Sequence, residues 1–175
     1  MSVHHIALAT RDLAATHRFY TEVMGFRLVK VICAAWPGSE AGGWAKHVFY
    51  ATSEDPNAGL IAFWEVNEPS LEGNFRSDIS TGLGLPQWVN HLAFTVPTEE
   101  ALAAKRARWA EHGLPVTDMD HDFCRSIYTT DPNGTMVEFC VTMRAFTAEE
   151  VREAERLVFE KAPAEIEPEP VGLPQ

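Results

Sequence analysis

The chain has 175 residues, of which 46% are hydrophobic and 22% are charged, and these proportions are typical of a folded globular protein. Its formal net charge of −11 argues against nucleic acid as a partner, because affinity for a phosphate backbone comes mainly from Lys and Arg. The sequence has neither an apolar run of about 18 residues nor a basic leader, so we expect no membrane span and no signal peptide. The three cysteines form no Cys-x-x-Cys pair, which indicates free thiols and a cytoplasmic protein.

The chain contains two copies of one pattern. An apolar strand opens on His5 and leads into a helix at Asp12, and a second apolar strand opens on His91 and leads into a helix at Thr98. Asp and Thr side chains accept the free N–H groups of a helix N-terminus, and a glycine follows each predicted helix as a left-handed terminal residue. Such internal repetition predicts one structural unit used twice.

The second half of each copy also matches. The segments that begin at Tyr50 and Tyr128 are strands interrupted by Asp-Pro-Asn and a nearby Gly, a composition typical of hairpins. Each copy is therefore a βαβββ module, and the modules occupy residues 2–66 and 89–143. We predict an α+β domain in which the two modules form a curved, half-barrel-like sheet with the helices outside.

The remaining segments join and extend the modules. The linker at 67–88 is rich in Gly, Pro and Ser and exceeds the common connection length, so it either covers a site or exchanges a module between subunits; we expect a homodimer. Thr147 and Glu150 form a capping box, which opens a C-terminal helix over 146–162. The tail at 163–175 is rich in Pro and Glu and is expected to be mobile.

Three side chains form a candidate metal site. His5 and His91 open equivalent strands, so a pseudo-twofold pairing of the modules directs both imidazoles into one cavity. Glu138 lies among apolar neighbours on the last strand, and a buried carboxylate is costly unless a cation or a donor meets it. Each residue alone would fit an ordinary structural role. Together, at repeat-related positions, they indicate nitrogen and oxygen ligands for a catalytic divalent metal.

These residues carry a resemblance to a known family. With the sequence DPNGTMVEF at 131–139, they resemble the vicinal oxygen chelate superfamily, which includes glyoxalase I, fosfomycin-resistance proteins, methylmalonyl-CoA epimerase and extradiol dioxygenases. The resemblance covers residues 2–142. It implies that His5, His91 and Glu138 are the metal ligands.

The branch of the family depends on a fourth ligand, which glyoxalase I and the epimerase place at the end of the first module. Alignment of Gly59 with Gly134 puts Phe63 at that position, and a phenyl ring cannot coordinate a metal. Glu65 remains open as a substitute. Without it, two histidines and one carboxylate leave three positions free, as in non-haem Fe(II) oxygenases, so Fe(II) is favoured and Zn(II), Mn(II) and Ni(II) remain alternatives.

A second motif also favours the dioxygenase branch of the family. From His121 to Glu138 the sequence resembles the signature of extradiol ring-cleavage dioxygenases, although Met119 departs from its first position. In those enzymes the equivalents of His121 and Tyr128 hydrogen-bond the substrate oxygens, so both are candidate catalytic residues, and each also fits a purely structural role. Those enzymes usually contain two pairs of modules and an additional acid/base histidine. Here His47 or His17 could take that role only if the fold brings one of them inward, and His17 lies in the middle of the first predicted helix, beside its solvent face.

The leading hypothesis is therefore an Fe(II) dioxygenase-like enzyme whose substrate chelates the metal through two vicinal oxygens. The alternatives are a glyoxalase-, isomerase- or fosfomycin-resistance-type lyase or transferase that uses a divalent metal without O₂, and a metal-free protein that binds a small molecule. In each case the partner is a small molecule. Aromatic side chains provide candidate walls for an apolar substrate pocket, and these are Phe63, Trp64, Trp44 and Trp88.

Overall fold

The computed structural model describes residues 3–55 and 58–161. Its first module contains β1 (His5–Thr10), α1 (Leu13–Arg18), a π-helical turn at Phe19–Val23, β2 (Arg27–Ala35), β3 (Trp44–Ala51) and β4 (Leu60–Asn67). Its second module contains β5 (His91–Thr95), α2 (Glu99–Glu111), β6 (Thr117–Asp120), β7 (Cys124–Thr130) and β8 (Met136–Thr142). Short 3₁₀ helices at Pro69–Leu71 and Thr81–Leu83 lie in the linker, and α3 (Ala148–Leu157) follows the second module.

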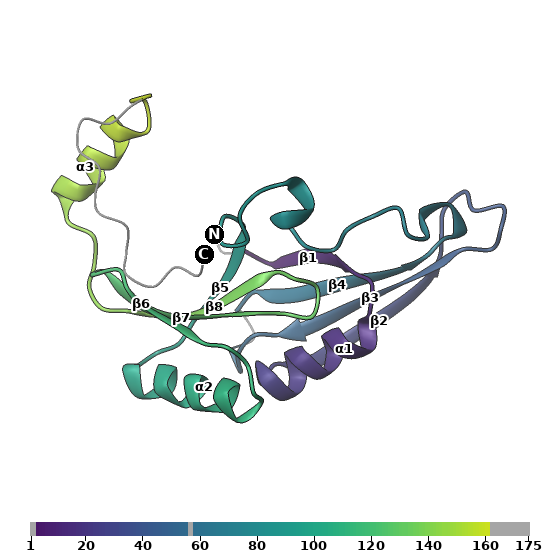
Figure 1. Ribbon diagram of the computed structural model, residues 1–175, viewed down its shortest axis with the longest axis horizontal. Coiled ribbons are helices and arrows are strands. Elements are labelled where there is room, and N and C mark those ends of the chain that lie inside the picture. The colour runs from purple at the N-terminus through teal and green to yellow at the C-terminus, as the bar shows by residue number, and fades with distance from the viewer. Residues whose placement is uncertain (1–2, 56–57, 162–175) are drawn as a thin grey trace.

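Each module forms its own four-stranded mixed sheet, in the order β1-β4-β3-β2 and β5-β8-β7-β6. The first and last strands of each module run parallel, and the other neighbours run antiparallel. Figure 1 shows the two sheets in tandem, with α1 and α2 along the same side and α3 projecting away from the body. The predicted α+β fold with two βαβββ modules is confirmed, and the eight strands are divided between two sheets instead of one continuous ladder.

The helices begin at the predicted caps. The carboxylate of Asp12 accepts a hydrogen bond from the backbone N–H of Ala15 at 2.8 Å, and Thr98 caps α2 in the same way. Thr147 and Glu150 form both halves of a capping box at α3, which satisfies two of the free N–H groups at the start of that helix. These local signals fix the start of each helix.

The C-terminal helix is shorter than predicted, because α3 ends at Leu157 and the chain turns before Lys161. The tail at 163–175 lies outside the described residues, as do residues 56–57 in the first Asp-Pro-Asn turn. Among the described helices, none combines the length and the apolar character that a membrane crossing requires.

One hydrophobic core joins the two modules. It lies where the sheets meet α1 and α2, and its residues come from both halves of the chain. The rings of Phe26 and Phe94, one from each module, have centroids 4.9 Å apart, and Trp109 of α2 packs at 5.3 Å from Phe139. Aromatic pairs of this geometry each contribute about 1 kcal/mol beyond their burial, so the Phe26–Phe94 contact helps to hold the modules together.

A buried polar network also ties the modules together. The hydroxyl of Tyr20, in the first module, donates a hydrogen bond to Asp131 of the β7–β8 turn at 3.0 Å. The backbone N–H groups of Asn133 and Thr135 donate to the other oxygen of this carboxylate, each at 2.9 Å. The side chain of Asn133 then donates to Thr16 of α1 at 3.2 Å. The turn that positions β8 is therefore anchored to the helix of the other module.

We expect Asp131→Ala to lower the free energy of unfolding by about 3 kcal/mol, because it leaves a buried hydroxyl and two backbone N–H groups without their acceptor. Urea denaturation would measure this change. The matched control is Asp118→Ala, which removes a carboxylate from an exposed ion pair with Arg106 and should cost less than about 1 kcal/mol. Equal losses in the two variants would contradict the role of the network.

Candidate metal centre

Two of the three predicted ligands, His91 and Glu138, face each other on one side of the second sheet. Ala93 lies opposite Glu138 across the parallel pair β5–β8, so His91, two residues earlier, shares the same face. Nε2 of His91 lies 3.2 Å from Oε2 of Glu138. Two ligand atoms that each lie about 2.1 Å from a metal, at right angles to one another, are about 3 Å apart. The pair therefore has the separation required of adjacent ligands of one divalent cation.

Hydrogen bonds orient both ligands. Nδ1 of His91 donates to the backbone carbonyl of Trp88 at 2.9 Å, which turns Nε2 toward the carboxylate, an arrangement typical of metal-binding histidines. The hydroxyl of Ser126 donates to the other oxygen of Glu138 at 2.5 Å. Only 5% of Glu138 is exposed, so its carboxylate is held in one position.

The pKa shifts show how the pair is neutralised. Burial raises the pKa of Glu138, but hydrogen bonds from His91 and Ser126 outweigh it and hold the pKa below the usual value. The hydrogen bond to Glu138 in turn raises the pKa of His91. A proton between Nε2 and the carboxylate satisfies the pair, and a divalent cation would take the place of that proton, because both ligands must be deprotonated to bind a metal.

The two candidate catalytic residues lie together beside Glu138. Tyr128 lies opposite Glu138 across the antiparallel pair β7–β8, and its hydroxyl is 2.9 Å from Nε2 of His121. Burial raises the pKa of the Tyr128 hydroxyl, which therefore stays protonated. The ring of Tyr128 also lies 6.1 Å from that of His91, so one face of the second module holds four of the predicted site residues.

The third predicted ligand, His5, lies apart from this pair. Its Nδ1 is 2.8 Å from Nδ1 of His4, and its ring packs near those of His47 and Phe49, with centroids 6.2 and 5.7 Å away. Within residues 3–55 and 58–161, no three His, Cys, Asp or Glu side chains gather closely enough to hold a metal ion. The three predicted ligands therefore do not converge within the described part of one chain, which leaves a site shared between two chains as the alternative.

The structure corrects the alignment of the two modules by one residue. The strand registers place Ala62, and not Phe63, where the second module has Glu138, because the second turn holds one more residue between its glycine and the strand. Phe63 lies on the opposite face, fully buried in the core, so it cannot line a substrate pocket. Glu65 shares that face and pairs with Lys46 at 2.9 Å. The first module thus offers no fourth ligand.

The same correction applies to the aromatic residue that matches Tyr128. Phe49 lies opposite Ala62, as Tyr128 lies opposite Glu138, whereas Tyr50 points into the core. The first module therefore carries a phenyl ring where the second carries a hydroxyl. At these two pairs of equivalent positions, only the second module carries polar side chains, namely Tyr128 and Glu138.

The three predicted tryptophans have different positions. Trp64 lies on the face that bears His5, and its ring stacks on that of His47 at 3.9 Å. Trp44 lies on the opposite face, with the amine of Lys46 over its ring, so the expectation that it lines the site is wrong. Trp88 is 43% exposed and contributes its backbone carbonyl to His91.

His47 was a conditional candidate, and the fold brings it inward. It pairs with Trp64 across β3–β4, on the same face as His5, and it is only 8% exposed. Burial lowers its pKa, and the nearby imidazole of His5 lowers it further. Among the described residues, Nε2 of His47 has no hydrogen-bond partner. The first module thus presents a buried neutral imidazole beside its ligand.

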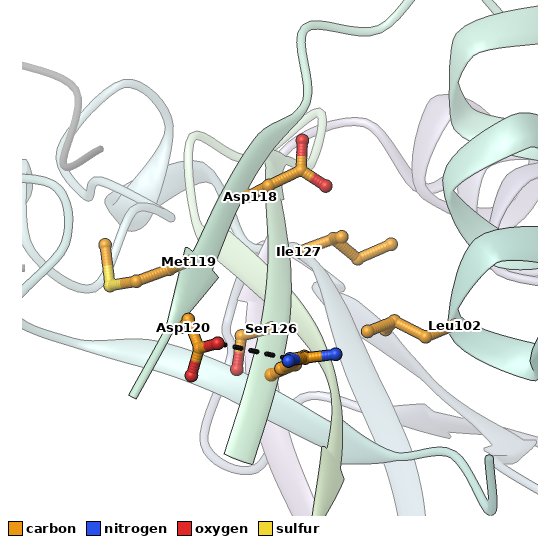
Figure 2. Close-up of a pocket in the computed structure, with 7 residues that line it drawn as sticks. Leu102, Asp118, Met119, Asp120, Ser126 and Ile127 are labelled. Carbon is orange, nitrogen blue, oxygen red and sulfur yellow. Dashed lines mark hydrogen bonds and ion pairs between the residues drawn. The ribbon is translucent and has the colours of Figure 1, made fainter. Parts of the chain in front are cut away.

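Sequence reasoning missed Ser126, although a signal was present. It lies two residues before Tyr128 on the same strand, and alternation therefore places it on the site face. Figure 2 shows the other side of this strand, where Ile127 points toward Leu102 of α2 in a pocket of about 350 Å³, while Ser126 turns away from the helix. Glu138 does not line that pocket, although Ser126, which donates a hydrogen bond to Glu138, does.

Comparison with known proteins agrees with this architecture. A family model of the Glyoxalase/Bleomycin resistance protein/Dioxygenase superfamily matches residues 2–139. The chain belongs to this superfamily. The match includes all three predicted ligands, the first module and the second module as far as Phe139 in β8.

Individual relatives are distant. A protein of Bacillus subtilis (strain 168) named catechol-2,3-dioxygenase is 25% identical over 136 residues, which are 78% of this chain and 40% of that protein. A glyoxylase/bleomycin resistance protein/dioxygenase domain from Frankia sp. EAN1pec has a TM-score of 0.58 at 19% identity and covers 81% of this chain and 98% of its own. The fosfomycin resistance protein FosX from Listeria monocytogenes has a TM-score of 0.51 at 20% identity, with 86% and 97% covered. The two structural likenesses establish the superfamily fold, and the chain spans less than half of the B. subtilis protein.

We expect Glu138→Gln to weaken the binding of Fe(II) or Zn(II) about 100-fold or more, because the amide keeps the shape of the side chain and removes the charged ligand. Metal content after anaerobic dialysis, measured by mass spectrometry, would show the loss. Glu65→Gln is the matched control, since Glu65 lies on the other face of its sheet and should leave metal content unchanged. Normal metal content in Glu138→Gln would show that the metal centre is misplaced.

Proposed function

We propose that this superfamily member is a metal-dependent enzyme of the vicinal oxygen chelate type, an Fe(II) dioxygenase-like protein acting on a small molecule that chelates through two neighbouring oxygens. The observation that carries the proposal is the hydrogen-bonded pair of His121 and Tyr128 directly beside Glu138. Two histidines and one carboxylate leave three coordination positions free, which suits two substrate oxygens and O₂.

Two further observations support this branch over the glyoxalase branch. Ala62 stands where a fourth protein ligand would lie, so the coordination sphere stays open. The printed name of the B. subtilis relative, catechol-2,3-dioxygenase, describes a substrate with two vicinal hydroxyls, and we extend that class of substrate to this chain as part of the proposal.

Each residue of the proposed site has a separate role in the reaction. Bound Fe(II) supplies Lewis acidity that lowers the pKa of a substrate hydroxyl, together with redox chemistry toward O₂. Tyr128 keeps its proton and donates it as a hydrogen bond to a substrate oxygen, while its own oxygen accepts a hydrogen bond from Nε2 of His121. His47 is neutral and buried, and it accepts the proton that the second substrate hydroxyl releases. Ser126 holds Glu138 in place throughout.

The test of this function is anaerobic reconstitution with Fe(II), followed by oxygen uptake in the presence of a panel of catechols. We expect uptake that depends on both iron and catechol, and we expect Tyr128→Phe to reduce kcat by about 100-fold, within the range for loss of one positioned hydrogen-bond donor. An absence of uptake, combined with activity of a Zn(II) or Ni(II) form on a thiol adduct, would favour a lyase or transferase. An absence of metal binding, with the small molecule still bound, would favour a binding protein.

The proposed enzyme is a homodimer in which a second copy completes the metal site. The side chain of Ile6, which points away from the His5 face, lines a pocket together with Ala93, which lies on the His91 face. The edges of β1 and β5 therefore adjoin, and within the described residues His5 does not gather with His91 and Glu138. Ile6 and Val89, each within two residues of a histidine ligand, are also 43% and 38% exposed, and such large apolar side chains favour burial in an interface.

Complementation tests this assembly. If His5 of one subunit joins His91 and Glu138 of the other, coexpressed His5→Ala and Glu138→Ala chains form a heterodimer with one intact site and one doubly mutated site. We expect each homodimer to bind metal poorly and the doubly tagged heterodimer to regain half of the wild-type metal content. A heterodimer that remains depleted would show that each site is built within one chain.

A further inference from the structure

The turn between β6 and β7 carries His121, and its backbone is strained. The carbonyl of His121 accepts a hydrogen bond from the backbone N–H of Phe123 at 2.8 Å, which closes a three-residue turn around Asp122. Within the described part of the chain, Asp122 is the only residue other than glycine with a positive φ, of 68°. Such a turn is rare and strained for a residue with a side chain, so the position of His121 depends on the contacts that hold Asp122.

The segment that follows β8 contacts the backbone and the ring of this turn. The carbonyl of Phe123 accepts hydrogen bonds from the backbone N–H groups of Met143 at 2.8 Å and Arg144 at 3.4 Å. The rings of Phe123 and Phe146 have centroids 5.0 Å apart. The outer side of the turn is therefore fixed to the residues between β8 and α3.

Arg144 also binds the side chain of the strained residue. Its Nε donates to the carboxylate of Asp122 at 2.9 Å, and its Nη2 donates to the same oxygen. Its two Nη atoms donate to the carboxylate of Glu150 in α3, at 3.0 and 2.6 Å, and these hydrogen bonds lower the pKa of Glu150 to about 2. Glu150 is therefore charged at neutral pH, and one guanidinium joins the strained turn to the start of α3.

The turn matters because His121 contacts a buried side chain of the candidate site. Nε2 of His121 lies 2.9 Å from the hydroxyl of Tyr128, and Tyr128 is 8% exposed, whereas His121 is only half-buried. One hydrogen bond fixes one atom of the imidazole and leaves the backbone that carries it unconstrained. The orientation of the imidazole therefore depends on the turn.

We propose that Arg144 is a positioning residue, which holds Asp122 and thereby keeps Nε2 of His121 at the hydroxyl of Tyr128. This role rests on the proposed function for the part that His121 and Tyr128 play in the reaction. The side chains of Arg144 and Asp122 are 37% and 77% exposed, and exposed ion pairs contribute little to stability. The pair therefore acts on the geometry of the turn more than on the stability of the fold.

Attachment of α3 to the second module is the competing role for Arg144. That role requires Glu150, whereas the positioning of His121 requires Asp122. Asp122→Asn removes the charge that pairs with Arg144 and keeps a residue that tolerates a positive φ. Two control variants leave Asp122 in place. Glu150→Gln removes the charge on the helix side while Gln still completes a capping box, and Arg156→Met removes an arginine that pairs within α3.

NMR of the full-length, metal-free protein tests the positioning without any activity. Long-range ¹H–¹⁵N spectra at pH 8 show which ring nitrogen carries the proton, and His121→Asn assigns the signals of His121. In the wild type we expect a single tautomer with the proton on Nε2. Arg144→Met and Asp122→Asn should give a mixture of tautomers, Arg144→Lys should restore part of the wild-type spectrum, and the two control variants should match the wild type.

Turnover by the iron form gives the second measurement. We expect Arg144→Met to lower kcat for catechol at least about tenfold, because a small misplacement of a reacting group is costly, and to leave KM within about twofold, because the metal ligands are intact. Arg156→Met should leave both constants unchanged.

The outcomes separate this role from the proposed function. A mixture of tautomers in Asp122→Asn but not in Glu150→Gln supports the positioning role even if no catechol consumes oxygen, and only the proposed function then fails. A single tautomer in both Arg144→Met and Asp122→Asn, or a mixture already in the wild type, overturns the positioning role whether or not the iron form is active. Equal disturbance in Asp122→Asn and Glu150→Gln also overturns it, because Arg144 would then serve to attach the helix. If Arg144→Met does not fold, Asp122→Asn decides the question by the same two measurements.

Discussion

The parallel pairing of the first and last strands in each module is the constraint on which the site depends. In the second module it places Glu138 on the same face as His91, and antiparallel pairing with β7 adds Tyr128 and Ser126 to that face. A carboxylate in this position is nine-tenths buried and must be satisfied by neighbours. It is satisfied by hydrogen bonds from one imidazole, one serine hydroxyl and the hydroxyl of Tyr128. The separation of His91 and Glu138 that results also suits two ligands of the proposed metal.

The two modules share this framework and differ in what they present. At the positions equivalent to Glu138, Tyr128 and Ser126, the first module carries Ala62, Phe49 and His47, by the paired registers of the two sheets. One half therefore provides charge and hydrogen bonds, and the other provides a predicted ligand histidine and apolar surface. If the two faces meet around the proposed metal, the low dielectric of the apolar half would strengthen every electrostatic interaction of the polar half.

The sequence alone predicted the features that depend on local chemistry. Repetition revealed the two modules, and Asp12 and Thr98 marked the helix starts. Strand register depends on turn length, and one additional residue after Gly134 moved the true counterpart of Glu138 from Phe63 to Ala62. The separation of His5 from the other ligands depends on how the modules pack, through contacts such as Phe26 with Phe94 and Tyr20 with Asp131, which no local pattern encodes.

The hydrophobic core that joins the modules and the proposed subunit interface use opposite faces of the two sheets. The core uses the helix-facing sides of both sheets, where Tyr20, Phe63 and Trp109 are fully buried. This arrangement leaves His5 and His91 exposed, although Glu138 and Tyr128 beside His91 are buried. A single chain satisfies its hydrophobic core without bringing the three predicted ligands together, and in the proposed dimer a second copy would supply the missing histidine. Under that proposal assembly and metal binding would be coupled, since each would stabilise the state that the other requires.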